Sequence, residues 1–239
     1  MITLGMLLLA AWWSFLGTGK APPANESEFV DIHQVDPSIA IDLRYATANN
    51  VARRPLYSPG TPAMVRSGVA RRLVVVQKYL QAKGFGLKIW DAYRPESTQT
   101  ELWKATHNRS FVADPNEGIG SMHTRGAAVD ATLVDRAGRE LPMPTGYDNF
   151  TPAALMIYQG RDPAVRANLK LLQKAMAHGG FYGMRTEWWH FAAPDWKKYP
   201  HVPDLKSSRA KSRDPVERRA GFTGIPRLRS ASLGMTDSL

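Results

Sequence analysis

The segment Ser121–Asp130 reads Ser-Met-His-Thr-Arg-Gly-Ala-Ala-Val-Asp, and the rest of the chain is interpreted outward from it. His123 and Asp130 are seven residues apart in this segment, and a Gly lies between them. Further along, residues 187–190 (Glu-Trp-Trp-His) add a second imidazole and a second carboxylate. A catalytic zinc site needs three protein ligands, an open position for water and a general base beside it. The two segments together supply that set.

Either segment alone would be a weak signal. A single His beside a Gly loop is more often a surface or core residue than a metal ligand, so a motif match of this size is only a hypothesis. The chain contains no Cys, which excludes thiolate ligands and leaves imidazole and carboxylate as the donors for zinc. The pairing of the two segments therefore favours a metal site.

Hydrophobic patterning predicts the elements that carry these segments. Short apolar runs predict strands at residues 29–35, 39–44, 87–90, 127–134 and 184–192. Helical spacing and capping signals predict helices at residues 62–84, 96–107 and 163–178. Helices that alternate with hairpin-like strands predict an α+β fold, in which an antiparallel sheet carries the zinc site and is flanked by helices.

The predicted strand at 184–192 raises a geometric difficulty. Glu187 and His190 are three residues apart, so in a regular strand their side chains point to opposite faces. Both side chains can face one metal only if the strand twists strongly, bulges or ends between them.

Length and charge indicate how the chain is divided. With 239 residues, we predict one domain at 25–204 that carries the metal site, preceded by residues 1–24 and followed by a basic disordered tail at 205–239. The formal net charge is +10, and much of the excess falls in that tail, so it says little about the active site. The tail is either a solvated end or a binder of anionic polymer or a membrane surface. The sequence predicts neither a nucleic-acid partner nor a particular oligomeric state.

The N-terminal segment predicts export. Residues 2–16 are almost continuously apolar, and small residues and Pro follow at 17–24. This run is short for a membrane span, which needs about 20 apolar residues, and it is similar to the apolar core of a secretory signal. No Lys or Arg precedes it. We therefore predict a periplasmic or secreted protein with no stable membrane span after signal removal, with a cytoplasmic protein or an uncleaved membrane anchor as alternatives.

Four blocks identify a family. In order and spacing they resemble the D-alanyl-D-alanine dipeptidases, the zinc enzymes of the vancomycin-resistance type, and the blocks are Asp42–Thr47, Ala92–Pro95, Ser121–Asp130 and Glu187–His190. A fifth block, residues 143–148 (Met-Pro-Thr-Gly-Tyr-Asp), looks like the family's Met-Gly-x-x-Phe-Asp segment, with Pro and Tyr in place of its Gly and Phe. The resemblance implies hydrolysis of D-Ala-D-Ala or a similar small D,D-dipeptide.

Carried over by position, the resemblance implies the catalytic roles. One zinc ion per chain would be held by His123, Asp130 and His190, with Glu187 as the base and Arg94 as the cation that stabilises the transition state. The chemistry agrees, because zinc activates water and a carboxylate can take its proton. An Arg never loses its charge, which suits it to face an oxyanion. The alternative for Arg94 is a structural ion pair.

The resemblance also implies two substrate contacts. Ser121 would help to bind the substrate carboxylate, and Asp148 would pair with the free ammonium group. A carboxylate placed in this way selects free dipeptides over longer or blocked chains, so Asp148 would separate a dipeptidase from a carboxypeptidase. The alternatives are that Asp148 is a turn acid and that Ser121 caps a turn.

Two other functions compete with the dipeptidase. One is a zinc D,D-carboxypeptidase that trims peptidoglycan stem peptides, since the metal site would be the same. The other is a non-catalytic module that binds cell-wall peptide. Glu187 and Arg94 argue against the module, because a structural zinc ion needs neither.

Overall fold

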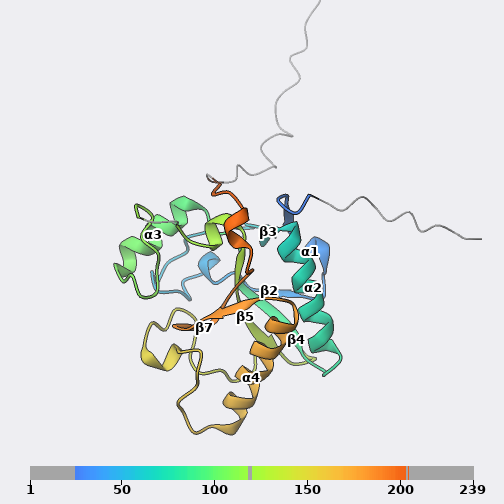
Figure 1. Cartoon of the computed structure of the whole chain (residues 1–239). Coiled ribbons are helices and arrows are strands. Elements are labelled where there is room, and N and C mark those ends of the chain that lie inside the picture. The colour runs from blue at the N-terminus through green and yellow to red at the C-terminus, as the bar shows by residue number, and fades with distance from the viewer. Residues whose placement is uncertain (1–24, 118–119, 203, 205–239) are drawn as a thin grey trace, which may run out of the picture. The chain divides into compact units, whose positions relative to one another are not determined.

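The structure is a computed structural model, and it describes residues 25–117, 120–202 and 204. Its α-helices are α1 (Ile32–Val35), α2 (Ser67–Gln81), α3 (Glu96–Thr106) and α4 (Pro163–His178). Its strands are β1 (Phe29–Asp31), β2 (Ala40–Ile41), β3 (Met64–Arg66), β4 (Gly86–Asp91), β5 (Ala128–Val134), β6 (Tyr182–Met184) and β7 (Glu187–Ala192). Figure 1 shows these elements in one compact body.

The main sheet has five strands in the order β2-β4-β5-β7-β6. Every neighbouring pair in it is antiparallel except β2 and β4, which are parallel. A separate two-stranded sheet joins β1 to β3. The predicted α+β fold, with a mainly antiparallel sheet flanked by helices, is confirmed.

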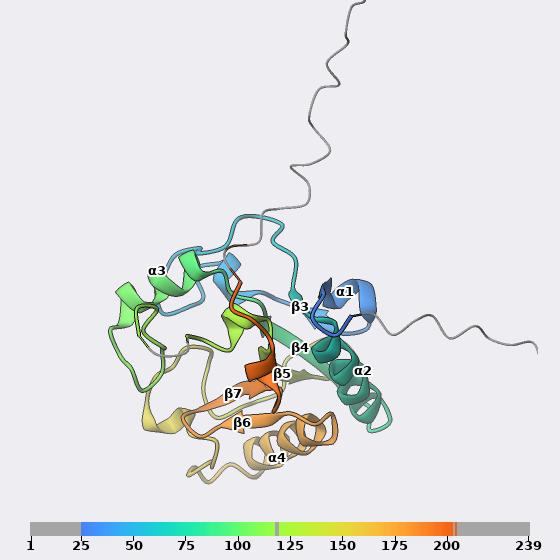
Figure 2. The ribbon, with the colours of Figure 1, turned by 45° about the horizontal axis from the view of Figure 1, so that its top comes forward.

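The alternation of side chains along β5 separates the core from the predicted site. Val129, Ala131 and Leu133 are fully buried and belong to the hydrophobic core. Helices α2 and α4 pack against each other and against the central strands β4 and β5, and both lie on the same side of the sheet in Figures 1 and 2. Because successive side chains of a strand point to opposite faces, Asp130 faces away from the core and from these helices.

Two predicted helices are confirmed and one begins later than predicted. Helix α3 matches the prediction within one residue, and α4 begins as predicted at Pro163, where the side chain of Asp162 accepts hydrogen bonds from two backbone N–H groups. The helix predicted from Pro62 begins only at Ser67, because residues 64–66 form β3 and pair with β1. Pairing with a distant strand outweighs local helical spacing here.

The first two predicted strands are shorter than predicted. The run at 29–35 is a strand only as far as Asp31, whose carboxylate accepts from the N–H of His33 and so begins helix α1. The run at 39–44 keeps only Ala40–Ile41 as a strand, and a one-turn 3-10 helix follows at Arg44–Ala46. A carboxylate that accepts from a nearby backbone N–H favours a turn over continued pairing.

Within the described residues, no helix has the length and apolar character that crossing a membrane requires. The predicted export segment at 1–24 and the predicted tail at 205–239 lie outside the described residues.

Candidate metal centre and active site

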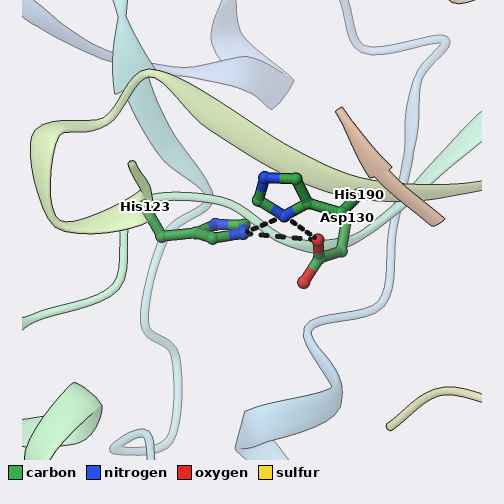
Figure 3. A group of neighbouring side chains, drawn as sticks. All are labelled: His123, Asp130 and His190. Carbon is green, nitrogen blue, oxygen red and sulfur yellow. Dashed lines mark hydrogen bonds and ion pairs between the residues drawn. The ribbon is translucent and has the colours of Figure 1, made fainter. Parts of the chain in front are cut away.

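Three predicted ligands come from neighbouring elements. Strands β5 and β7 place Asp130 directly opposite His190, and a one-turn 3-10 helix just before β5 supplies His123. His123 Nε2 lies 3.0 Å from His190 Nδ1 and 3.3 Å from Asp130 Oδ1. His190 Nδ1 lies 3.1 Å from the same oxygen, so three ligand atoms face one point (Figure 3).

These distances fit one zinc-sized ion. Ligand atoms at about 2.0–2.1 Å from a tetrahedral zinc lie about 3.3 Å from one another. The three side chains are 2%, 2% and 5% exposed, and two imidazoles with one carboxylate are a common donor set for catalytic zinc. Within the part of the chain that the structure describes, no other group of His, Asp and Glu side chains comes together in this way.

The backbone fixes the ring of His123. Its Nδ1 lies 2.8 Å from the carbonyl oxygen of Ala92, so Nδ1–H donates to that carbonyl and Nε2 keeps the lone pair that a metal needs. Gly126 ends the turn with φ +67°, and a Cβ atom at this position would collide with the ring of Phe29. Only Gly fits there, which explains its place between the two ligands.

A bulge in β7 resolves the difficulty with Glu187. Gly183 and Met184 are neighbours on β6, but their partners on β7, Phe191 and Glu187, are four residues apart. The strand is therefore irregular between Glu187 and His190, and both side chains line the same pocket. The regular alternation that would separate Glu187 from His190 is therefore interrupted where the pairing of β6 with β7 shifts register.

Glu187 is buried without a complete set of partners. It is 6% exposed, and its Oε1 atom has no hydrogen-bond partner in the structure. Burial raises the pKa of the Glu187 carboxyl well above its usual value, and the nearby carboxylates of Asp130 and Asp148 raise it further. A carboxylate with a raised pKa and a free oxygen is a stronger base than an exposed Glu.

Arg94 is held rigidly beside the same centre. Its Nε and Nη2 atoms donate to Asp91 Oδ2 at 3.0 and 2.8 Å, and Nη1 donates to Gln99 Oε1 at 2.9 Å. Its guanidinium carbon lies 4.9 Å from the ring centre of Tyr45, and its Nη2 lies 3.6 Å from Asp130 Oδ2. Arg94 therefore forms a structural ion pair, with Asp91, which was its predicted alternative role. Its guanidinium group also places a positive charge at a fixed position in the pocket.

The two predicted substrate contacts also face this pocket. Asp148 is 9% exposed and adopts a left-handed φ of 54°. Its carboxylate accepts from the hydroxyl of Tyr45 at 3.3 Å and from the backbone N–H of Val51 at 3.1 Å. Burial raises the pKa of Asp148 to about 7, against the lowering effect of the Val51 N–H. Ser121 Oγ accepts a hydrogen bond from the N–H of His123 at 3.2 Å. Ser121 therefore caps the turn that begins there, which was the predicted alternative to a substrate contact.

The structure thus brings all the predicted site residues into one pocket of about 90 Å³, and these are Arg94, Ser121, His123, Asp130, Asp148, Glu187 and His190. They come from blocks that span residues 94–190 of the sequence. The pocket holds a cluster that could bind a metal ion, a buried carboxylate with a raised pKa, a fixed cation and a further carboxylate, and such a set is compatible with metal-assisted hydrolysis.

Comparison with known families decides the assignment. The Peptidase M15 family model, described as D-ala-D-ala dipeptidase, matches residues 25–208 of this chain. The chain belongs to the D-Ala-D-Ala dipeptidase family. It is therefore a metallopeptidase, and the resemblance found in the sequence is confirmed.

Relatives in the D-Ala-D-Ala dipeptidase family match over nearly their whole length. The D-alanyl-D-alanine dipeptidase of Escherichia coli (strain K12) is 34% identical over 181 residues, which cover 76% of this chain and 92% of that protein. The protein of the same name from Streptomyces coelicolor is 30% identical over 200 residues, with 74% and 95% covered. That from Enterococcus faecalis is 25% identical over 193 residues, with 73% and 95% covered.

Solved structures show a weaker likeness. A mutant of the vancomycin-resistance D,D-pentapeptidase VanY, in complex with Zn(II), is 17% identical with a TM-score of 0.37, and 57% of this chain and 76% of that chain are covered. The LD-carboxypeptidase LdcB is also 17% identical, with a TM-score of 0.38 and 74% of each chain covered.

Asp91 is a site residue that the sequence reasoning missed. It is fully buried, it binds Arg94, and its other oxygen accepts from the hydroxyl of Tyr57. Its Oδ2 atom also lies 3.4 Å from His123 Nδ1. A signal was available, because an Arg at the end of a buried strand needs a carboxylate partner and Asp91 is three residues before it.

We expect Asp91→Ala to lower the free energy of unfolding of the metal-free protein by about 3–5 kcal/mol, since it leaves the Arg94 charge buried without its main partner. Urea unfolding followed by tryptophan fluorescence measures this. Glu101→Ala removes exposed ion pairs with Arg54 and Lys104 and is expected to change stability by about 1 kcal/mol or less. Equal effects of the two variants would show that the buried pair contributes no more than a surface pair.

Proposed function

We propose that this chain hydrolyses D-Ala-D-Ala, or a similar small D,D-dipeptide, to free amino acids with one zinc ion per chain. His123, Asp130 and His190 would hold the ion. The observation that carries the proposal is that their three ligand atoms lie 3.0–3.3 Å apart, in the same pocket as a buried Glu187 oxygen without a partner.

When bound, zinc polarises the scissile carbonyl and lowers the pKa of the attacking water. Glu187 takes the proton of that water on a carboxylate oxygen and passes it to the amine that leaves. The raised pKa of Glu187 supports both steps. A carboxylate of higher pKa takes the proton of water more readily, and its protonated form can then donate that proton to the more basic amine.

Arg94 stabilises the negative oxygen that develops during attack. Asp91 and Gln99 hold its guanidinium in place before substrate arrives, so little reorganisation is needed in the transition state. The charge of Arg94 is constant over the working pH range, and it favours the transition state over the neutral ground state.

Asp148 and Ser121 bind the two ends of the dipeptide. The carboxylate of Asp148 pairs with the free ammonium group, which a longer or acetylated peptide cannot present at that position. Ser121 Oγ uses a lone pair to accept from His123 N–H, so its own O–H group is left to donate to the substrate carboxylate. Ser121 can therefore cap its turn and bind substrate at the same time.

The test is a substrate panel with metal control. Purified protein is incubated with zinc, and separately with a chelator, against D-Ala-D-Ala, L-Ala-L-Ala and N-acetyl-D-Ala-D-Ala, and the released alanine of either configuration is measured. We expect cleavage of the free D,D-dipeptide alone, its loss with chelator and its return when zinc is restored. Cleavage of the acetylated peptide would instead identify a carboxypeptidase, and no cleavage despite stoichiometric zinc would identify a peptide-binding module.

We also propose that the protein acts outside the cytoplasm, on dipeptide derived from peptidoglycan. The apolar run at residues 2–16 supports this. Fractionation of native cells with and without a signal-peptidase inhibitor tests it: the protein is expected in the periplasmic or secreted fraction, and a longer form should accumulate with the inhibitor. A cytoplasmic protein of unchanged size would overturn the proposal.

A further inference from the structure

The hydroxyl of Tyr147 contacts the metal centre in a way that the sequence did not predict. It donates a hydrogen bond to Asp130 Oδ2 at 2.8 Å. The other oxygen of this carboxylate, Oδ1, is the atom that faces His123 and His190. The two oxygens of Asp130 are thus divided, one toward the metal position and one toward the phenol.

Neighbouring aromatic rings hold the ring of Tyr147 in an orientation that points its hydroxyl at Asp130. It makes edge contacts with the rings of Tyr45, Trp90 and Trp189, at centroid distances of 5.5, 5.5 and 5.7 Å. Tyr147 is 9% exposed. Edge-to-face contacts on several sides oppose rotation of the ring, so the hydrogen bond to Asp130 is formed before any ligand binds.

Tyr147 is the better placed of the two groups near Asp130 Oδ2. Arg94 Nη2 approaches this oxygen only to 3.6 Å, which is beyond ordinary hydrogen-bond distance. Arg94 is also bound to Asp91 and Gln99. The phenol therefore supplies the short hydrogen bond that fixes how the carboxylate is turned.

We propose that Tyr147 is a positioning residue of the metal centre, whose hydroxyl holds Asp130 as a ligand through one oxygen and so tightens metal binding. The inference rests on the proposed zinc site. A carboxylate whose second oxygen is hydrogen-bonded is already turned for binding through the first, and it must break that bond to bind through both. Hydrogen bonds of this kind typically change metal affinity by about 10–100-fold.

A mild variant tests this role. Tyr147→Phe removes one oxygen atom and keeps the aromatic contacts. We expect zinc affinity, measured by competition with a chromogenic chelator, to fall about 10–100-fold, while the metal-free variant keeps the urea midpoint of the wild type within a small shift.

A spectrum and a matched control complete the experiment. The visible absorption of the Co²⁺-loaded variant is expected to change, because cobalt with an extra carboxylate oxygen absorbs more weakly. Tyr45→Phe removes a hydroxyl from the same aromatic cluster, but that hydroxyl bonds Asp148 and no metal ligand, so zinc affinity should stay unchanged. Wild-type zinc affinity in Tyr147→Phe would overturn the inference alone, whereas a wild-type protein that binds no zinc would overturn the proposed function.

Discussion

Glu187→Gln is expected to lower kcat for D-Ala-D-Ala by about 10³-fold, within the range of about 10²–10⁴ that a general base contributes. Gln has the shape of Glu but cannot take the proton of the attacking water. Glu187 is not among the three side chains that face the metal position, so the variant should bind zinc as the wild type does. Initial rates of D-alanine release, with the zinc content measured on the same sample, test both statements.

The same substitution is expected to make the metal-free protein more stable. Burial raises the pKa of Glu187 above its value in the unfolded chain, so the folded state favours the protonated form. The stability that this group contributes is present at low pH and is lost as pH rises from the unfolded pKa through the folded one. Gln stays neutral, so its advantage over Glu should be larger at pH 8 than at pH 5.

Urea unfolding in the presence of a chelator, at both pH values, measures this difference. Glu28→Gln, at an exposed position outside the pocket, is the matched control and should leave both activity and stability unchanged. A Glu187→Gln protein that is inactive but less stable than the wild type would point to misfolding instead of a lost base.

The candidate residues of the site were predictable from the sequence because they fall in short blocks, and the order and spacing of these blocks resemble those of a known family. His123 and Gly126 lie in one turn and Asp130 lies in the strand that follows it, so this short block brings together two candidate ligands and the Gly that the turn requires. The contacts that hold these residues were harder to predict. Tyr147 reaches Asp130 from a loop seventeen residues away, and nothing in the pattern of that loop indicates which oxygen it would contact.

Secondary structure failed where distant pairing decides the outcome. Val65 belongs to an apolar stripe with helical spacing, yet it is a buried strand residue because β3 pairs with β1, whose residues lie more than thirty positions earlier. The strand predicted at 184–192 is a hairpin, because Tyr182–Met184 folds back on Glu187–Ala192. Periodicity describes one element at a time, and it cannot show where a second strand will make the first one bulge.

Asp148→Asn is expected to lower kcat/KM for D-Ala-D-Ala by about 10²–10³-fold, since removing one partner of a buried charge pair costs about 2–5 kcal/mol. Asn is nearly isosteric, tolerates the left-handed φ of 54°, and can still accept from the N–H of Val51. Inhibition of this reaction by N-acetyl-D-Ala-D-Ala, which has no ammonium group, should be equally strong in the variant and in the wild type. An equal loss of affinity for the acetylated peptide would mean that Asp148 positions the pocket and does not select a free amino terminus.

The stability of the Asp148→Asn variant gives an independent answer. In the metal-free protein, burial raises the pKa of Asp148 from 3.8 to about 7, so its favourable contribution is present below pH 3.8 and is lost as pH rises through 7. At pH 8 the ionised Asp148 therefore costs roughly 4 kcal/mol relative to a neutral side chain, and the Asn variant should be the more stable protein. Glu28→Gln, at an exposed position outside the pocket, is again the control, and its effect on stability should be small. A buried carboxylate that lowers stability in this way is consistent with a role in binding. The free ammonium group of the substrate is the positively charged partner that would stabilise it.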